Sequence, residues 1–147
     1  MVGELYPAHA GATARAYFAF VSAAEQHAAL HTLPLGRYTD TTVIDSGQLQ
    51  ELYRATARTG YALTFGEWDS RTWALAVPVR LGSRAAGSLS LVGLKDTVTR
   101  ARVEELVEPV QRTAVELGDL LSSKTRPPRR DWRLGRGDRR AVRTHDG

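Results

Sequence analysis

The chain contains no cysteine among its 147 residues. Without thiols, a disulfide framework, a thiolate zinc site and a cysteine nucleophile are all excluded. No apolar stretch approaches the roughly 20 residues that a membrane-spanning helix needs. The first residues, MVGELYPAHAG, also lack the charged and apolar regions of a signal peptide. The sequence therefore predicts a soluble, cytoplasmic protein with no membrane contact.

Catalytic motifs are also missing. The chain has no G-x-S-x-G elbow, H-E-x-x-H pair, P-loop or dinucleotide fingerprint, and its carboxylates are dispersed instead of clustering at strand ends. His27 and His31 have a spacing that can hold a metal on a helix, but no third ligand lies nearby in the sequence. We therefore expect no enzymatic activity, no metal and no cofactor.

Positive charge is concentrated at the C-terminal end. The whole chain has a net charge of +4, whereas residues 122–147 hold nine basic and three acidic residues, a net charge of +6. This segment has few apolar residues and scattered Pro and Gly, so it cannot bury enough surface to fold alone. We predict one domain over residues 1–121 and a disordered basic tail over residues 122–147. The tail could contact nucleic acid weakly and without specificity, although a solvated extension without a role is the simpler interpretation.

Helix signals dominate the first half of the domain. Apolar residues at helical spacing predict a helix in AGATARAYFAFV, and Ser22-Ala-Ala-Glu25 is a capping-box pattern that opens a second one. The run TTVI at residues 41–44 is β-prone. Asp45 then caps a further helix, which Gly60 ends.

Strand signals dominate the second half. YALTF is one predicted strand, and WALAVPVRLGSRAAGSLSLVGL is a hairpin with its turn at LGSR. Thr99 then caps a long helix in which Pro109 predicts a kink or a break. The order predicts an α+β domain with a central, mainly antiparallel sheet flanked by helices. Small residues on the hairpin leave room for either a cavity or a closely packed helix, namely Ala74, Ala76, Gly87 and Ser88.

Several motifs occur in the same order as in the effector-binding domain of IclR-type transcriptional regulators, which the chain resembles over roughly residues 3–121. They are PAHAGATARAYFAF, LPLGRYTDTTVID, RTGYALTFGEW, and ALAVPV followed by GSLSLVG and the terminal helix. The resemblance implies a GAF/PAS-like sensor fold, a small-molecule pocket between the sheet and a loop near the start, and association into homo-oligomers.

The resemblance also places the effector-binding residues. The pocket loop corresponds to Gly11, Ala12, Thr13 and Ala14, whose backbone N–H groups could face an anion near a helix start. The sheet positions at which many relatives carry an Asp, a Cys and two Ser correspond to Thr64, Ala74, Ser90 and Val92. Only Ser90 keeps the usual residue type. Since an unpaired polar group costs about 1 to 3 kcal/mol, we expect a less polar small organic acid or aromatic effector, or none.

Other residues near these motifs have two interpretations each. Trp73 and Phe65 favour the core over a pocket wall, because large aromatic side chains dominate small cores. Trp68 is either a pocket lid or a surface residue, and His9 either contacts an anion or packs near a helix start. Arg15 could pair with a carboxylate effector or face water.

Regulators of this type resemble two-part proteins, with a winged helix-turn-helix ahead of the sensor. We expect this chain to lack that domain and to reach DNA only through a missing N-terminal domain or a partner subunit. The expected function is effector sensing in the regulation of transcription. The alternative is a structural or partner-binding oligomerisation module with a decayed pocket, and saturable small-molecule binding distinguishes the two.

Overall fold

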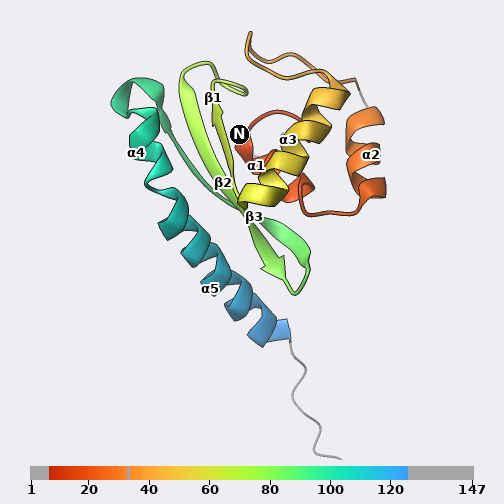
Figure 1. Cartoon of the computed structure of the whole chain (residues 1–147), viewed down its shortest axis with the longest axis vertical. Coiled ribbons are helices and arrows are strands. Elements are labelled where there is room, and N and C mark those ends of the chain that lie inside the picture. Colours follow the sequence, from red (N-terminus) through yellow and green to blue (C-terminus); the bar gives the residue numbers. More distant parts are fainter. Residues whose placement is uncertain (1–6, 33, 126–147) are drawn as a thin grey trace, which may run out of the picture.

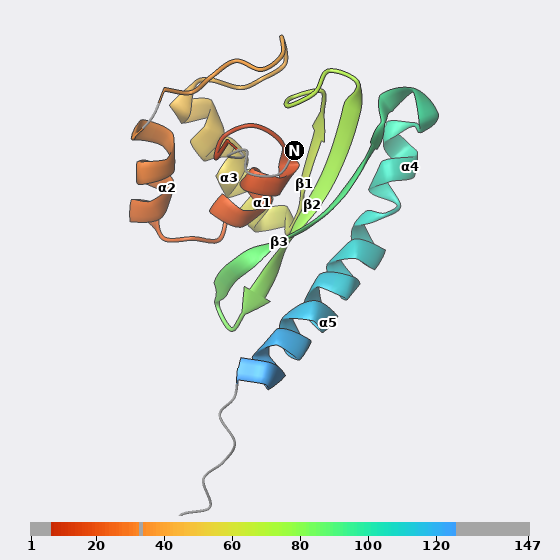
Figure 2. The same ribbon diagram turned by 180° about the vertical axis from the view of Figure 1, so that it is seen from behind.

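The computed structural model describes residues 7–32 and 34–125 of the chain. Its elements, in order, are α1 (Ala12–Phe18), α2 (Ala23–His31), α3 (Ser46–Thr59), β1 (Ala62–Phe65), β2 (Thr72–Leu81), β3 (Arg84–Leu94), the 3-10 helix η1 (Lys95–Thr97), α4 (Arg100–Glu104) and α5 (Val107–Thr125). Helices α1, α2 and α3 lie on one side of the sheet, and α4 and α5 lie on the other (Figures 1 and 2). Within the described ranges, no helix is both long and apolar enough to cross a membrane.

Local capping signals set the helix boundaries. Ser22 and Glu25 form the predicted capping box at the start of α2. The Asp45 carboxylate accepts the N–H of Gln48 at the start of α3, and Gly60 ends that helix with a left-handed φ of 79°. Each of these caps satisfies backbone groups that a helix end leaves without partners, which is why sequence alone located them.

The sheet has three antiparallel strands in the order β1-β2-β3. β2 and β3 form the predicted hairpin, whose turn contains Gly82 with a φ of 64°. The predicted α+β architecture with an antiparallel sheet is therefore confirmed.

Both faces of β2 are covered, and the two faces carry side chains of different size. On one face, Ala62 and Ala76 pack against Ala12 and Ala16 of α1. On the other face, larger side chains form the main core with the C-terminal helices, and its buried members are Trp73, Leu75, Val77, Val79, Val103, Val110 and Ala114. Because both faces of β2 are covered, apolar and polar residues do not alternate along it. The small residue at Ala76 makes room for a closely packed helix, α1, and not for a cavity at that point.

A second cluster joins the end of α1 to α2 and α3. Its buried residues are Ala19, Leu30, Leu49 and Tyr53. This cluster fixes the three N-terminal helices as one unit over the α1 face of the sheet.

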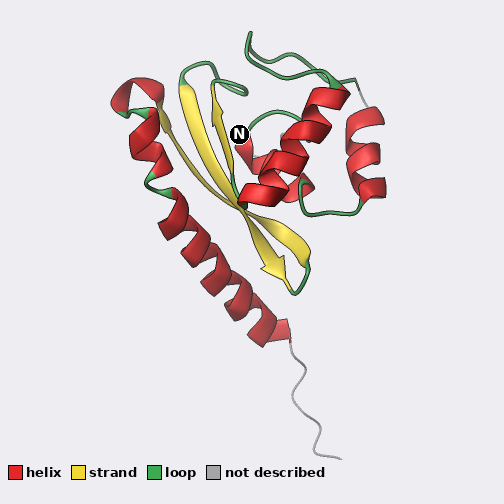
Figure 3. Ribbon diagram, in the orientation of Figure 1, coloured by secondary structure: helices red, strands yellow, loops and turns green. Residues whose placement is uncertain are grey.

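The prediction of a β-prone run at residues 41–44 was wrong, since this segment is a loop (Figure 3). The hydroxyl of Thr42 accepts the backbone N–H groups of Tyr38 and Thr39, which curls the loop on itself. It also donates to the backbone carbonyl of Glu67. Hydrogen bonds made by side chains here replace the ladder that a strand would need.

The long C-terminal helix is divided in two, as Pro109 predicted. α4 ends at Glu104 and α5 begins at Val107, so that Pro109 lies in the first turn of α5. Proline is tolerated there because the missing N–H has no acceptor within the helix. α5 continues to Thr125, past the boundary predicted at residue 121. The rest of the predicted tail, residues 126–147, lies outside the described residues.

Candidate functional site

The residues predicted to bind an effector lie on the α1 side of the sheet. Thr64, Ala74 and Val92 are direct neighbours across the three strands, and Ser90 lies opposite Ala76. The predicted loop, residues 11–14, forms the start of α1 on the same side, where Ala12 packs on the sheet. The fold therefore brings the two predicted segments into one layer.

Thr13 connects α1 to β3 by two hydrogen bonds. Its hydroxyl lies 2.9 Å from the hydroxyl of Ser90, and its backbone carbonyl accepts the hydroxyl of Ser88 at 3.0 Å. Ser90, the one sheet position that keeps the usual residue type, is thus already bonded within the protein.

The predicted residues differ widely in their access to a ligand. Ala12 is fully buried, and Gly11, Ala14 and Thr64 are buried as well. Thr13, Ala74 and Ser90 are partly buried. Val92 is 63% exposed on the outer strand of the sheet. In this conformation, Thr13 is the loop residue with side-chain surface available to a ligand.

A groove of about 380 Å³ lies beside Thr13, and we call it the α1 groove. It is lined by Pro7, Ala8, Thr13, Ala14, Tyr17, Phe18, Gly87 and Ser88. A neighbouring cavity of about 420 Å³ shares three of these residues, Ala8, Tyr17 and Phe18, and extends to α2. The walls of both are mainly apolar, which suits an uncharged ring or aliphatic group.

Sequence reasoning missed the two aromatic residues of the groove. It assigned Tyr17 and Phe18 only to the apolar face of a helix, whereas in the fold they line both cavities. Consecutive residues of a helix point about 100° apart, so two adjacent aromatic residues cannot both lie at the centre of one buried face, and that was the available signal.

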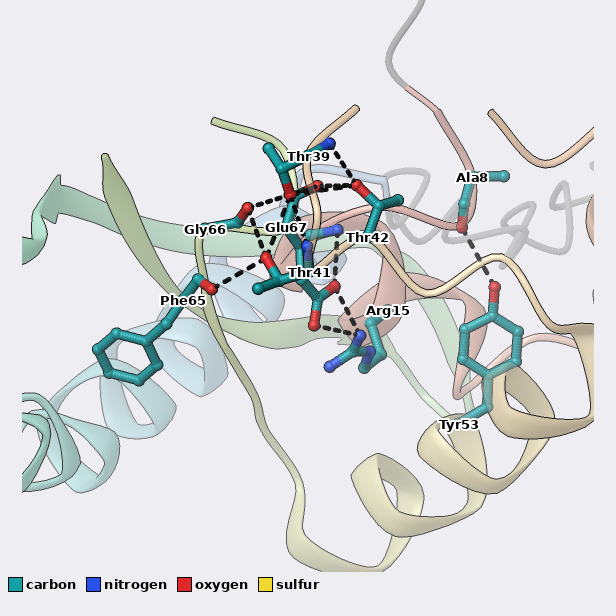
Figure 4. A network of polar contacts seen from close by, with 10 residues as sticks. Ala8, Arg15, Thr39, Thr41, Thr42, Tyr53, Phe65, Gly66 and Glu67 are labelled. Atoms are coloured by element: carbon teal, nitrogen blue, oxygen red, sulfur yellow. Dashed lines mark hydrogen bonds and ion pairs between the residues drawn. The ribbon is translucent and has the colours of Figure 1, made fainter. Parts of the chain in front are cut away.

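A buried ion pair lies at the other side of α1. Arg15 contacts both carboxylate oxygens of Glu67, at 2.8 and 2.7 Å, and the N–H of Gly11 donates to the same carboxylate at 3.3 Å (Figure 4). The exposed fractions of the Arg15 and Glu67 side chains are 6% and 12%. The carboxylate that reaches the predicted pocket loop thus belongs to the chain itself, and Arg15 does not face water.

The backbone at Gly66 and Glu67 is fixed by the threonine-rich loop between α2 and α3, residues 39–42. The hydroxyls of Thr39 and Thr41 donate to the carbonyl of Gly66 at 2.5 and 2.8 Å, and Thr42 donates to the carbonyl of Glu67 at 2.7 Å (Figure 4). These bonds fix the turn between β1 and β2. Glu67 therefore meets Arg15 on a well-supported backbone.

The aromatic residues near this turn pack together. The ring centroids of Trp68 and Tyr38 lie 4.4 Å apart. The ring centroids of Tyr38 and His9 lie 5.7 Å apart. His9 is buried, and its Nε2–H donates to the carbonyl of Gly36 at 2.7 Å. Of the two interpretations of His9, the structure therefore agrees with packing near the start of α1.

Burial perturbs one titratable group near α1. Burial raises the pKa of Tyr53 to about 12, although the positive charge of Arg15 opposes the shift. The Tyr53 hydroxyl donates to the carbonyl of Ala8 at 3.1 Å. This tyrosine therefore stays protonated and ties the segment before α1 to α3.

The described residues contain no group of three or more His, Asp or Glu side chains that could hold a metal ion. His27 and His31 stack with their ring centroids 4.2 Å apart on α2.

A family model described as the C-terminal domain of the bacterial transcriptional regulator IclR matches residues 1–118. This chain belongs to the IclR family. The match confirms the resemblance seen in the motifs and the sensor-type fold. It also agrees with the prediction that the chain is not an enzyme, since IclR proteins are transcriptional regulators.

The IclR domain has similar relatives of known sequence or structure. The HTH-type transcriptional regulator KipR of Bacillus subtilis (strain 168) is 26% identical over 117 residues, which cover 79% of this chain and 47% of KipR. An IclR homologue from Microbacterium hydrocarbonoxydans, solved in complex with 4-hydroxybenzoate, is 25% identical with a TM-score of 0.72. The similarity covers 84% of this chain and 49% of that one. The chain thus spans about half the length of these relatives.

A third relative is an isolated inducer-binding domain. The double mutant of the PobR transcription factor domain from Acinetobacter, in complex with 3-hydroxybenzoic acid, has a TM-score of 0.71 at 23% identity. The similarity covers 83% of this chain and 69% of that domain. It supports the IclR effector-binding fold.

Proposed function

We propose that this IclR domain senses a small aromatic acid or a similar small organic effector and thereby regulates transcription. The observation that carries the proposal is the α1 groove, in which Tyr17 and Phe18 lie beside the hydroxyl-bearing residues Thr13 and Ser88. Two relatives were solved with hydroxybenzoates, which combine an aromatic ring with a few polar groups.

The chemistry of the groove fits this class of effector. An aromatic ring gains from contact with the Tyr17 and Phe18 rings. The hydroxyls of Thr13 and Ser88 each make one hydrogen bond within the protein, and their oxygens can still accept a hydrogen bond from a ligand hydroxyl. A ligand with many hydrogen-bonding groups would leave some of them unpaired in so apolar a groove. Thr64, Ala74 and Ser90 lie on the face of the sheet beneath α1, whereas Val92 is 63% exposed, and none of these four residues lines the α1 groove.

In this proposal the domain acts within a homo-oligomer. Sequence-specific contact with DNA is made by a separate DNA-binding domain or by a partner subunit. The basic residues beyond 121 add weak contact without sequence preference.

The competing proposal is an oligomerisation module whose pocket is no longer used. Two observations favour it: Ala12 is fully buried against the sheet, and Thr13 and Ser90 satisfy each other's hydroxyls. In that case no small molecule binds saturably.

Thermal unfolding with a ligand panel separates the two proposals. The panel contains 4-hydroxybenzoate, 3-hydroxybenzoate, benzoate and, as a non-aromatic control, cyclohexane carboxylate. A bound ligand at about 100 times its Kd adds roughly 2.7 kcal/mol, which raises the Tm of a domain of this size by several degrees. Absence of any shift across the panel at millimolar concentration would rule out an aromatic-acid sensor.

Variants then test whether the α1 groove is the site. Ser88→Ala removes the groove hydroxyl that donates to the carbonyl of Thr13, whereas Ser83→Ala removes a hydroxyl in the exposed hairpin turn. We expect Ser88→Ala to weaken the ligand-induced shift and Ser83→Ala to preserve it. An equal response of the two variants would place the ligand elsewhere.

A further inference from the structure

We propose that the domain binds a free α-amino acid with an apolar side chain, in a site formed by two cavities that share Tyr17 and Glu25. The ammonium group of the amino acid contacts the carboxylate of Glu25, and its carboxylate contacts the guanidinium of Arg84. Its side chain lies between α1 and α2. The proposal goes beyond the sensing of an aromatic acid in the α1 groove and does not rest on it.

The two cavities meet at Tyr17, near the start of α2. The first is the cavity of about 420 Å³ beside α2, and we call it the α2 cavity. The second has a volume of about 330 Å³ and extends to Arg84 and Ala85 at the start of β3, and we call it the hairpin cavity. The connection between α1 and α2 lies beside the β2-β3 hairpin in both views (Figures 1 and 2). Tyr17 and Glu25 line both cavities, so one small molecule can occupy parts of each.

Glu25 and Arg84 carry opposite charges in the wall of the hairpin cavity without forming an ion pair with each other. The hydrogen bonds from Ser22 and, to a smaller extent, the positive charge of Arg84 lower the pKa of the Glu25 carboxyl, which is therefore ionised at neutral pH. Opposite charges that share a cavity but leave space between them suit a zwitterion, because each charged end of the ligand then faces its counter-charge.

The Glu25 carboxylate is held in one orientation by the capping box of α2. Its Oε2 accepts the backbone N–H of Ser22 at 3.0 Å and the Ser22 hydroxyl at 2.7 Å. Both bonds use the same oxygen, and Oε1 accepts no hydrogen bond from the residues that the structure describes. Because the side chain is already fixed, little conformational entropy is lost when an ammonium group binds to Oε1.

Arg84 is the arginine whose donors are available in this wall. The nearby Arg80 is already engaged, since its guanidinium lies 5.2 Å from the centroid of the Phe20 ring and donates to the carbonyl of Ser83 at 3.1 Å. Within the described ranges, the Arg84 guanidinium has no such partner. A guanidinium binds a carboxylate through two parallel N–H donors, which suits the carboxylate end of an amino acid.

The α2 cavity provides the apolar part of the site. The rings of Tyr17 and Phe18 meet edge to face, with their centroids 5.1 Å apart, and Ala28 and Ala29 of α2 leave room beside them. Glu25 lies where this apolar space joins the hairpin cavity, so an ammonium held there directs the side chain toward α2. Burial of apolar surface grows with side-chain size, so we expect affinity to rise from alanine to leucine to phenylalanine.

An NMR titration of the ¹⁵N-labelled 147-residue chain tests the proposal. L-Phenylalanine is added up to about 50 mM, a range that covers the weak affinity typical of exposed charges. We expect saturable shifts of the amide signals of residues 17–25 and 84–85. Two analogues each lack one charge: 3-phenylpropanoate has no ammonium group, and 2-phenylethylamine has no carboxylate. Each should bind about fivefold more weakly, which corresponds to the loss of about 1 kcal/mol for one exposed ion pair.

Variants assign the two charges to their residues. Arg84→Gln should weaken L-phenylalanine about fivefold and leave 2-phenylethylamine unchanged, because the amine has no carboxylate to lose its partner. Glu25→Gln should weaken L-phenylalanine similarly and leave 3-phenylpropanoate unchanged. Glutamine also serves in a capping box, so this variant keeps the start of α2. Arg58→Gln and Glu116→Gln are the matched controls, since both residues are exposed and line neither cavity.

Three results would overturn the proposal. Absence of saturable shifts with L-phenylalanine removes the site. An analogue with a single charge that binds as tightly as L-phenylalanine shows that the ligand is not a zwitterion. Equal affinities of Arg84→Gln and Arg58→Gln for L-phenylalanine place the ligand elsewhere. All three leave the aromatic-acid proposal intact, because that proposal is tested by the response of hydroxybenzoate binding to Ser88→Ala.

Discussion

Arg15 on α1 and Glu67 in the turn after β1 form an ion pair at 2.7 Å, although they lie 52 residues apart in the chain. Almost none of either side chain is exposed. The pair connects the helix that borders the α1 groove to the turn fixed by the threonine-rich loop. Removing one partner from such a pair leaves an uncompensated charge in a poorly solvated place, which costs far more than the pair contributes when intact.

The first prediction follows from that asymmetry. Glu67→Ala should lower the free energy of unfolding by about 3 to 5 kcal/mol, because Arg15 stays buried without its counter-ion. Glu51→Ala is the control, since Glu51 and its partner Arg54 are 67% and 61% exposed and surface pairs contribute about 0 to 1 kcal/mol. Urea unfolding of both variants provides the comparison.

A double variant tests the reason for this cost. Arg15→Met combined with Glu67→Leu removes both charges, so it should recover most of the stability lost in Glu67→Ala. A double variant as unstable as the single one would show that packing, and not the unpaired charge, explains the loss.

The second prediction concerns the hydroxyl pair between α1 and β3. Thr13→Val and Ser90→Ala each remove one partner of the 2.9 Å contact. A double-mutant cycle on the free energy of unfolding should give an interaction energy of about 1 kcal/mol, the usual net value of such a hydrogen bond. Additive effects of the two substitutions would mean that water replaces the contact in solution.

The third prediction concerns the contact between α5 and β2. A methyl group on Gly118 would lie 2.5 Å from the carbonyl oxygen of Arg80, closer than real contacts allow. Alanine is favoured over glycine in helices by about 1 kcal/mol, yet we expect Gly118→Ala to lower stability by about 1 to 3 kcal/mol, because α5 must move off the strand. Gly87→Ala, which has nothing within 4 Å, should leave the thermal midpoint unchanged or slightly higher.

The fourth prediction is a pH dependence. Burial raises the pKa of Tyr53 from 10.0 to about 12, so the folded protein keeps this proton more tightly than the unfolded chain does. The corresponding stability is complete below pH 10 and is lost as the pH rises from 10 to 12, where only the unfolded chain releases the proton. The unfolding free energy should fall less steeply between pH 10 and 12 in Tyr53→Phe than in the original chain. Tyr38→Phe should retain the steeper fall, and an unchanged slope in Tyr53→Phe would assign the effect to another group.

The fifth prediction concerns DNA. The full chain should bind duplex DNA weakly and without sequence preference, with an affinity that collapses as salt concentration rises, because its basic residues are concentrated beyond residue 121. A chain ending at Thr125 should lose this binding in a titration followed by fluorescence anisotropy. Discrimination between an operator and a scrambled duplex by the shortened chain would reveal a DNA-reading element within the domain.

Sequence reasoning located the parts of the fold that are decided locally. Ser22, Asp45 and Gly60 act on backbone groups within a few residues, so their effect is visible in a short window. Pro109 likewise breaks a helix through its own ring and its missing N–H. The hairpin followed from two apolar runs around one turn.

The remainder depended on contacts between distant residues. Nothing near residues 41–44 shows that Thr42 will bond the carbonyl of Glu67, and β-propensity alone pointed to a strand. The partnership of Arg15 with Glu67 has no local signal either. The predicted site residues follow from motif order, which places them on one side of the sheet but does not tell that Ala12 is buried and Val92 exposed.

Helix α1 has only seven residues, well below the about 12 to 15 that an isolated helix needs to persist in water. The helix is therefore stable only because of its contacts with the rest of the domain. These are the alanine contacts with the sheet, the hydrogen bonds of Thr13 and the ion pair of Arg15. Opening of these roughly two turns should be a low-energy event that precedes global unfolding, and hydrogen exchange should record it as early deuterium uptake in residues 12–18. A molecule bound in the α1 groove would slow that uptake most strongly there, so the same segment serves as wall of the groove and as reporter of its occupancy.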